Sequence, residues 1–448
     1  MTPEEAEAYL AAIRQKRQKH LPPPIPPTNL SSTDLNDWYA KQKQIELLEK
    51  QRKQEAEDFL KSYRLKIEHT QVRQSGSEET EYSVESISHT NKDNNVKEQK
   101  LSPNEDLVSN GKHSSSVDPS IGSSTEWRNL VCQHEDSKFP PETDRYHLYV
   151  AYACPWSHRT TIVRNIKGLQ EVIGITYVHP TWQYTKPDVD DHRGWVFGSK
   201  EGEPLTNTSG VGRFPVSWGE EDQITHSKTI REIYEKSGDT TGKYILPILY
   251  DKKEGTIVSN ESSEIMRMLN CEFNSFSTNP DLDLYPSGIS DKIDEVNAWI
   301  YPTINNGVYR CGLASTQEEY DDAIDALTES FDRVEKLLKN HRFITGDVFT
   351  EADVRLFVTL LRFDEVYDVY FKCNTRSVAS TPTILNYVRD IYQMSGITET
   401  CRIDMIKAHY FTSHVELNKY SIIPRGDNFE ELLKQQHGRD SMSMSNQL

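Results

Sequence analysis

Apolar residues are sparse in the first part of the chain and recur in regular patterns only after residue 127. Over residues 71–124, single apolar residues are scattered among Ser, Asn, Glu and Lys. Ordering such a stretch would cost more conformational entropy than its burial could offset. Residues 35–69 are rich in strong helix formers but have few apolar positions, which predicts a solvated, partly formed helix. We therefore expect residues 1–120 to form a low-complexity, partly helical and mostly disordered extension.

Strand and helix patterns alternate in the region that follows. Apolar residues alternate along 145–153, as is typical of a strand, and the next residues are typical of a helix that ends at Gly168. The predicted elements are a strand at 145–153, a helix at 155–168, a strand at 172–180, a helix at 229–235, a hairpin of strands at 245–251 and 256–260, and a helix from residue 261. This is the order of a thioredoxin-like domain, which we place at residues 125–275.

The pattern becomes helical after residue 286. One apolar stripe recurs at spacings of three and four residues, which predicts a long helix. The stripe consists of Tyr320, Ile324, Leu327, Phe331, Val334 and Leu338. Thr350 and Asp353 match a capping box at the start of another helix, and we assign them a purely structural role. The pattern predicts an all-helical C-terminal domain at 285–430 and a disordered tail at 431–448.

The composition narrows the possible functions. The chain has 448 residues, of which 35% are hydrophobic, and 69 acidic against 51 basic residues give a net charge of −18. This charge argues against nucleic-acid binding. The sequence has no apolar run long enough to cross a membrane, and its N-terminal residues match neither a secretory signal nor a transit peptide. The six cysteines are too far apart for a disulfide framework or a metal cluster, so we expect a reduced, cytoplasmic protein without a metal.

Cys154 is the residue that points to chemistry. It follows the first predicted strand and precedes Pro155, which can start a helix without losing a needed backbone amide. The free amides and the dipole at a helix start stabilise a thiolate, so we expect its pKa to lie below the usual value of about 8.5. Ser157 stands where a second cysteine would resolve a disulfide. An oxidised Cys154 would therefore need an external thiol. The alternative is a buried structural cysteine that happens to precede a helix.

Two further segments fit a glutathione site. Pro247 is placed at the start of a predicted strand opposite Cys154. In thioredoxin-like folds this proline is cis, and the backbone of the preceding residue pairs with a bound thiol peptide. Asn260, Glu261 and Ser262 open a predicted helix and offer amides, a carboxylate and a hydroxyl to the charged end of glutathione.

With these features in place, residues 127–439 resemble the glutathionyl-hydroquinone reductases, the Xi class of glutathione transferases. The resemblance rests on the motifs RYHLYVAYACPWSHRT, GWVF, ILPILYDKKEGTIVSNESSEIMRMLN, WIYPTINNGVYRCG, GDVFTEADVRLFVTLLRFDEVY, FKCN and HYFTSH. It implies an α/β thioredoxin-like N-terminal domain plus an all-α glutathione-transferase C-terminal domain, and a homodimer. It also implies glutathione-dependent reduction of glutathionyl-hydroquinones to hydroquinones, with glutathione as co-substrate. The extension at 1–120 lies outside the resemblance, and its partner is open.

The resemblance also implies roles for individual residues. Cys154 matches the family's nucleophile, and Ser157 stands where the family usually has Ala. Matched to glutathione contacts are Trp195, which lies along the peptide, and Leu246, Glu261 and Ser262. Tyr309 and Tyr410 match the two tyrosines that face the quinol and would assist proton transfer. In the expected reaction the Cys154 thiolate attacks the glutathione sulfur, and a second glutathione resolves the resulting disulfide.

Other readings remain open from the sequence. An omega-like thioltransferase or dehydroascorbate reductase would share Cys154 but would not need Tyr309 and Tyr410. A catalytically idle transferase-like scaffold would use the extension for binding. The sequence favours structural roles for His158, Arg159 and His179, and it gives no catalytic role to Cys311 and Cys373.

Overall fold

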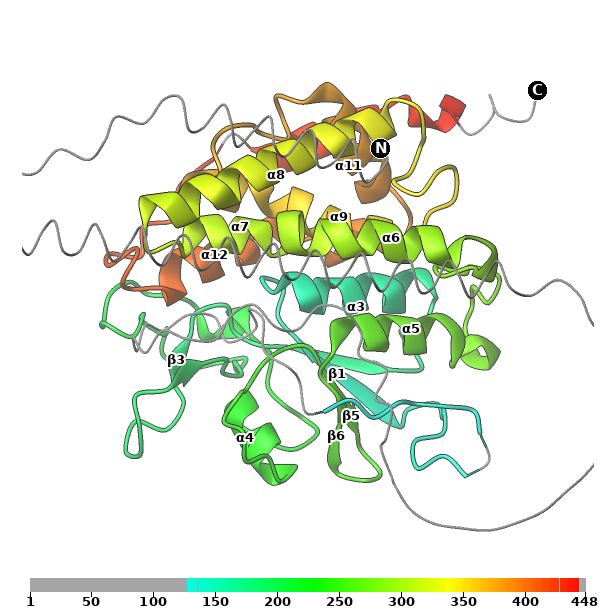
Figure 1. Ribbon diagram of the computed structural model, residues 1–448. Coiled ribbons are helices and arrows are strands. Elements are labelled where there is room, and N and C mark those ends of the chain that lie inside the picture. The colour runs from blue at the N-terminus through cyan, green and yellow to red at the C-terminus, as the bar shows by residue number, and fades with distance from the viewer. Residues whose placement is uncertain (1–126, 135, 427, 443–448) are drawn as a thin grey trace, which may run out of the picture. The chain divides into compact units, whose positions relative to one another are not determined.

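A computed structural model describes residues 127–134, 136–426 and 428–442 of the chain. Figure 1 shows the described part, in which a small sheet lies below a layer of helices. The predicted extension, its helix at 35–69 and its linker at 71–124 lie outside the described residues.

The N-terminal domain has the thioredoxin-like order predicted from the sequence. Its main sheet has the strand order β2-β1-β5-β6, with β1 parallel to β2 and antiparallel to β5. A separate antiparallel ribbon joins β3 to β4. The strands are β1 (Tyr146–Val150), β2 (Gly174–Tyr177), β3 (Gln183–Tyr184), β4 (Arg193–Gly194), β5 (Ile248–Asp251) and β6 (Thr256–Ser259). The helices are α3 (Pro155–Ile166), α4 (Ile230–Lys236) and α5 (Ser262–Cys271).

Strand β1 is shorter than predicted and is buried along its whole length. It lies between β2 and β5, with α3 and α5 over one face of the sheet (Figure 1). The alternating pattern therefore marks a central strand rather than one with a wet face. Helix α3 ends before Gly168, whose φ of +65° and close approach to Thr278 leave no room for a side chain.

The C-terminal domain is all-helical, as predicted. Its helices are α6 (Ser290–Ile300), α7 (Gly307–Gly312), α8 (Gln317–Leu338), α9 (Glu351–Arg362), α10 (Asp368–Tyr370), α11 (Pro382–Tyr392), α12 (Ile403–Ser413) and α13 (Phe429–Leu433). Two π-helical turns interrupt this series, at Tyr301–Asn305 and Phe363–Tyr367. The predicted stripe lies on α8, where all of its members except the half-buried Tyr320 are buried.

The capping box at the start of α9 is present. The carboxylate of Asp353 accepts a hydrogen bond from the Thr350 amide at 2.9 Å, and it also accepts from the Ile344 amide and the Tyr387 hydroxyl. Burial raises the pKa of Asp353 to about 6, although these hydrogen bonds favour the charged form. The motif fixes the start of α9, the helix that packs against α3, and so it has a structural role.

Arg362, at the end of α9, ties the two domains together next to Cys154. Its guanidinium is fully buried and donates to the carbonyl oxygens of Ala153 at 3.0 Å and Tyr152 at 2.8 Å. These two residues form the segment that leads into Cys154. The helical domain thus fixes the position of the cysteine through the backbone that precedes it.

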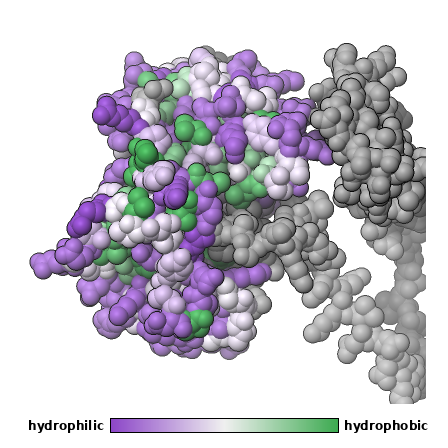
Figure 2. Space-filling model, turned by 90° about the vertical axis from the view of Figure 1, so that its left-hand side faces the viewer, coloured by the Kyte–Doolittle hydropathy of each residue, from purple (hydrophilic) through white to green (hydrophobic). Residues whose placement is uncertain are grey.

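The predicted disordered tail at 431–448 begins too early. Phe429 and Leu433 are buried on α13, and the side chain of Arg439 donates to the carbonyl oxygens of His341 and Arg342. These contacts anchor the segment up to residue 442 on the helical domain, because a buried guanidinium needs such acceptors. None of the helices in the described part of the chain is both long enough and apolar enough to cross a membrane. The face drawn in Figure 2 is mostly hydrophilic.

Candidate active site

Cys154 occupies the N-cap of α3. Its Sγ accepts a hydrogen bond from the Ser157 amide at 3.4 Å and lies 3.6 Å from the carbonyl oxygen of Leu246. The peptide bond between Leu246 and Pro247 is cis. The structure therefore confirms that Pro247 lies opposite Cys154, as expected, and Cys154 is only 7% exposed.

The start of α5 forms a second polar corner of the same region. Glu261 is the N-cap, and its carboxylate accepts from the amide and the hydroxyl of Ser263 at 3.0 and 2.8 Å. The buried hydroxyl of Ser262 has no hydrogen-bond partner among the described residues. An unsatisfied buried hydroxyl at a helix start fits an anionic group such as a carboxylate of glutathione.

Arg159 adds a buried positive charge to this region. Its Nε has no hydrogen-bond partner in the described part of the chain. Burial and the neighbouring Arg355 lower the pKa of Arg159 to about 10, whereas the charges of Glu261 and Cys154 act in the opposite direction. Because Arg159 interacts electrostatically with both Glu261 and Cys154, it lies near the start of α5 and near the cysteine of the candidate glutathione site. The sequence analysis assigned this residue only a structural role.

Trp195 is buried between the two domains. Its ring stacks on His409 of α12, with ring centres 4.5 Å apart. The Nδ1 of His409 lies 2.8 Å from the carbonyl oxygen of Pro180, and burial lowers the pKa of this histidine well below its usual value. His409 is therefore neutral, and it holds the Trp195 ring against α12, the helix that also carries Tyr410. Sequence reasoning missed His409, although it precedes Tyr410 in the motif HYFTSH.

Tyr309 and Tyr410 come from different helices, α7 and α12, and their hydroxyl oxygens are 2.6 Å apart. A third hydroxyl, from Tyr367 in the π-helical turn, lies 3.1 Å from that of Tyr410 and 3.5 Å from that of Tyr309. All three side chains are almost fully buried. The structure thus brings together the two tyrosines named in the sequence analysis and adds one that it did not name.

The cysteine and the tyrosines belong to one site. The ring of Trp156, two residues after Cys154, lies 5.4 Å from the ring of Tyr309. Burial raises the pKa of Tyr367, and the negative charge of Cys154 adds to this increase. The sulfur therefore lies close enough to the cluster for its charge to oppose the ionisation of Tyr367.

The other candidates from the sequence have ordinary structural contacts. The Nε2 of His158 lies 2.8 Å from the Thr400 hydroxyl, and His179 lies within hydrogen-bond distance of the Pro215 carbonyl and the Thr181 amide. The neighbouring thiol of Cys311 and burial raise the pKa of Cys373. These contacts explain the positions of these side chains, and no catalytic role is needed to explain them.

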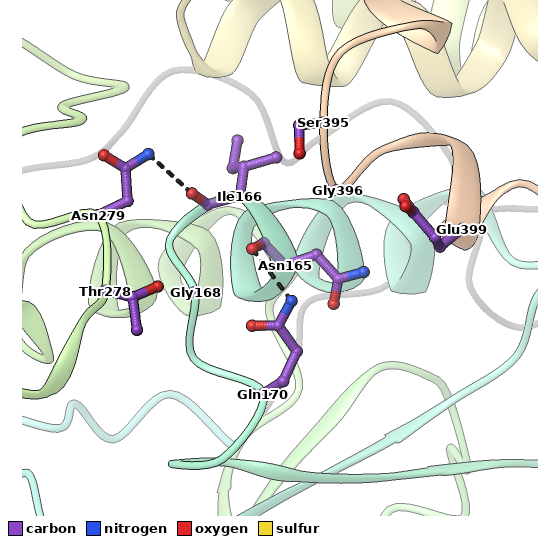
Figure 3. Close-up of a pocket in the computed structure, with 9 residues that line it drawn as sticks. All are labelled: Asn165, Ile166, Gly168, Gln170, Thr278, Asn279, Ser395, Gly396 and Glu399. Atoms are coloured by element: carbon purple, nitrogen blue, oxygen red, sulfur yellow. Dashed lines mark hydrogen bonds between the residues drawn. The ribbon is translucent and has the colours of Figure 1, made fainter.

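Two other places are separate from this site. Asp390, His437 and Asp440 could together ligate a metal, but Arg342 donates to both carboxylates at 2.8 and 2.7 Å and already offsets part of their charge. A hollow at the C-terminal end of α3 is lined by polar residues such as Asn165, and none of the candidate site residues lines it (Figure 3).

Family models match both domains of the chain. Residues 153–271 match the N-terminal domain of glutathione S-transferases, and residues 317–389 match the C-terminal domain. The matched ranges contain Cys154 and the start of α5 in the first domain and Tyr367 in the second. The fold is thus that of a glutathione transferase.

Individual relatives narrow this assignment. The chain is 42% identical over 303 residues to the glutathionyl-hydroquinone reductase YqjG of Escherichia coli. The aligned region covers 67% of this chain and 84% of the relative. It is 38% identical over 300 residues to the glutathione S-transferase omega-like 2 of Schizosaccharomyces pombe. This match covers 65% of this chain and 88% of the relative.

Solved structures agree with these relatives. The Xi glutathione S-transferase of Phanerochaete chrysosporium is 41% identical, with a TM-score of 0.60, and the match covers 68% of this chain and 97% of that one. The glutathione-bound structure of YqjG has a TM-score of 0.61 at 38% identity, and the match covers 72% of this chain and 98% of that one. The chain therefore belongs to the glutathionyl-hydroquinone reductases, the Xi class of glutathione transferases, and is an enzyme.

Proposed function

We propose that this enzyme reduces glutathionyl-hydroquinones to free hydroquinones, with glutathione as the reductant. The observation that carries the proposal is the cluster of buried tyrosine hydroxyls beside Cys154, with 2.6 Å between Tyr309 and Tyr410. Cleavage of a disulfide needs only a thiolate and a bound glutathione. Release of a hydroquinone from a thioether also needs a proton at an aromatic carbon, and the tyrosine cluster is suited to supply it.

The glutathionyl group would bind between Cys154 and the start of α5. The Leu246 backbone would pair with its peptide, while Ser262, Glu261 and Arg159 would hold its charged end. Trp195 would lie along it. Within the described part of the chain, the Ser262 hydroxyl and the Arg159 Nε have no hydrogen-bond partner, which supports this placement.

In the first step the Cys154 thiolate attacks the sulfur of the thioether. A sulfur–sulfur bond forms, the carbon–sulfur bond breaks, and its electron pair passes to the aromatic carbon, which takes a proton from the tyrosine pair. The hydrogen bond from the Ser157 amide favours the thiolate that starts this step. Tyr309 and Tyr410 would also hold the quinol oxygens.

In the second step the thiolate of another glutathione attacks the mixed disulfide. Glutathione disulfide leaves, and the Cys154 thiolate is restored. The thiol proton of the second glutathione replaces the proton that the tyrosines gave to the ring. The net reaction converts one glutathionyl-hydroquinone and one glutathione to one hydroquinone and one glutathione disulfide.

A second candidate function is that of an omega-like thioltransferase or dehydroascorbate reductase. The similarity to an omega-like transferase favours it, because the arrangement of Cys154 and Leu246 suffices for disulfide exchange. Turnover of glutathionyl-menadiol, dehydroascorbate and a mixed disulfide of glutathione with a small thiol, each with glutathione, separates the candidates. We expect turnover of glutathionyl-menadiol; its absence beside rapid turnover of the other two would contradict our proposal.

A homodimer and a cytoplasmic location, both expected from the sequence, belong to the same proposal. Size-exclusion chromatography with light scattering tests the dimer directly. A monomer at micromolar concentration would contradict it.

A further inference from the structure

Two buried thiols of the helical domain have no part in the proposed reaction. Cys311 lies in α7, and Cys373 lies in the loop that follows α10. Both are free cysteines, and their exposed fractions are 1% and 0%. The question that they raise is whether their positions allow them to react with each other.

The loop after α10 packs directly on the part of α7 that carries Cys311. The Sγ of Cys373 lies 3.8 Å from the carbonyl oxygen of Val308, which is three positions before Cys311. On the other side of Cys311, a side chain at Gly312 would collide with the ring of Phe371. The loop thus contacts α7 both before and after Cys311, which brings the two cysteine side chains together.

The two thiols differ in how readily they ionise. A hydrogen bond from the Cys373 thiol lowers the pKa of Cys311, and the charge of Arg310 acts in the same direction, whereas burial opposes both. The interaction with Cys311 and burial raise the pKa of Cys373. Oxidants react with the thiolate form of a cysteine. Cys311 is therefore the thiol that reacts first, and Cys373 is placed to resolve its oxidised form.

Burial limits which oxidants reach this pair. Lys372 and Asn374, the neighbours of Cys373 in the chain, are both exposed. Lys372 has a φ of +60°, so the backbone bends sharply at the surface just before Cys373 turns inward. Cys373 therefore lies directly beneath the surface. Hydrogen peroxide has only two heavy atoms and can reach such a position more easily than glutathione, which is a tripeptide.

We propose that Cys311 and Cys373 form a peroxide-sensitive pair whose disulfide impairs the tyrosine pair of the active site. The Cys311 thiolate attacks one oxygen of hydrogen peroxide, the oxygen–oxygen bond breaks, and the sulfur becomes a sulfenic acid. The hydroxide that leaves takes up a proton and becomes water. The Cys373 sulfur then attacks the sulfenic sulfur, a sulfur–sulfur bond forms, and a second water leaves. Two thiols thus lose two electrons, and one peroxide becomes two waters.

The disulfide would act on the active site through the backbone, and this effect rests on the proposed function. Tyr309 lies two residues before Cys311 on α7, and the Cys373 amide donates to the carbonyl oxygen of Tyr367 at 3.0 Å. A covalent bond requires the sulfur atoms to lie closer together than two separate thiols do, so α7 and the loop must shift. The 2.6 Å contact between Tyr309 and Tyr410 would change with them. The thioredoxin-like domain carries none of these groups, so reduction of a mixed disulfide should continue.

The hydroquinone product links the pair to the proposed activity. Hydroquinones react with dioxygen to give quinones and hydrogen peroxide, and the product is thus a source of the oxidant. Accumulation of free hydroquinone in the presence of dioxygen would then slow its own release. A thiol reductant restores both cysteines by thiol–disulfide exchange, in which the reductant is oxidised to its disulfide.

Mass spectrometry of the peroxide-treated protein tests the pair directly. The full-length protein is incubated with hydrogen peroxide, denatured in N-ethylmaleimide and digested without reduction. We expect two peptides linked through Cys311 and Cys373, and we expect dithiothreitol to separate them. Recovery of both cysteines as separate alkylated thiols, under conditions that oxidise the exposed Cys132, would overturn the proposal.

Turnover of two substrates tests the effect on the active site. Cys311→Ala removes one member of the pair. Cys401→Ala is the matched control, because Cys401 is also buried and its Sγ lies 3.4 Å from the Ile397 carbonyl oxygen, outside the pair. After removal of peroxide, each protein is assayed with glutathione on glutathionyl-menadiol and on the mixed disulfide of glutathione with 2-mercaptoethanol. The second reaction reports whether Cys154 is still active.

The ratio of the first rate to the second gives the outcome. Peroxide treatment should lower it by at least about tenfold in the unsubstituted protein and in Cys401→Ala, because small displacements of reacting groups are costly. In Cys311→Ala, and in Cys373→Ala as a second variant, it should change by less than about twofold. An unchanged ratio in protein that carries the linked peptides, or an equal fall in Cys311→Ala, would overturn the proposal. Failure of the untreated enzyme to release menadiol would instead overturn the proposed function.

Discussion

The two ends of the candidate site are built in different ways. At the glutathione end, backbone groups and helix starts define the geometry: Cys154 caps α3, and Glu261 caps α5. At the quinol end, three side-chain hydroxyls meet from α7, the π-helical turn and α12. The first end supplies amides and fixed charges. The second offers three buried hydroxyl groups.

This difference separates what the enzyme shares with other thioredoxin-like proteins from what distinguishes it. A helix start that stabilises a thiolate serves any disulfide exchange with glutathione. In the reaction that we propose, the hydroxyl cluster is needed only where a carbon must be protonated. We therefore expect substitutions at the first end to affect all glutathione-dependent reactions and substitutions at the second end to affect hydroquinone release alone.

The largest effect is expected for Cys154→Ser. Both hydroquinone release and mixed-disulfide reduction should be abolished, because a serine hydroxyl does not form the disulfide with glutathione on which each reaction depends. Cys271→Ser is the control, since Cys271 is an exposed free cysteine at the end of α5. Steady-state turnover with both substrates and mass spectrometry of the glutathionylated protein check this. Residual activity in the first variant would move the nucleophile elsewhere.

The next effect should be confined to one substrate. In the double variant Tyr309→Phe/Tyr410→Phe, hydroquinone release should fall by at least about 100-fold, because a positioned proton donor is lost. Reduction of the mixed disulfide should change by less than about threefold, since that step needs no carbon protonation. Parallel kinetics with glutathionyl-menadiol and the mixed disulfide measure the ratio. Equal losses would mean that the hydroxyls shape the glutathione pocket or the fold, and no loss would favour the omega-like function.

A smaller effect, shared by both substrates, is expected for Ser262→Ala. Its unsatisfied hydroxyl is proposed to donate to a carboxylate of glutathione, and loss of such a hydrogen bond should raise the KM for glutathione by about tenfold. Ser263→Ala is the adjacent control, because its hydroxyl already donates to Glu261 at 2.8 Å. Initial rates at varied glutathione concentration give both values. A change in KM with one substrate only would break the division between the two ends.

The same division explains how much the sequence could predict. Helix starts and apolar periods are local, so the thioredoxin-like order, the capping box at Thr350 and the helix start at Cys154 follow from short segments. The cis Pro247 and its place opposite Cys154 are instead expectations from thioredoxin-like folds in general. Strand ends are less well defined, and β2 begins at Gly174 rather than at residue 172. The apolar stripe predicted which face of α8 is buried, but no sequence pattern predicted which elements that face contacts.

The quinol end depends on how helices distant in sequence pack together. Tyr309 and Tyr410 are separated by 101 positions, and among 22 tyrosines only a family resemblance marked them. Tyr367, His409 and Arg362 lie inside motifs that carry the resemblance, yet their roles depend on a π-helical turn, a ring stacked on Trp195 and carbonyl oxygens in the other domain. No local pattern encodes such contacts.

The smallest effect is expected from deletion of residues 1–115. All proposed catalytic and glutathione-binding residues lie between Cys154 and Tyr410, and both ends of the site use groups within that range. The truncated protein should therefore keep its specific activity on glutathionyl-menadiol and on the mixed disulfide within about twofold, as expected when a segment of low apolar content is removed. Activity and melting temperature of the full chain and the truncated chain are compared at equal concentration. A folded, soluble truncated protein that has lost only hydroquinone release would mean that the extension completes the quinol end, whereas loss of both reactions would assign it to the glutathione end.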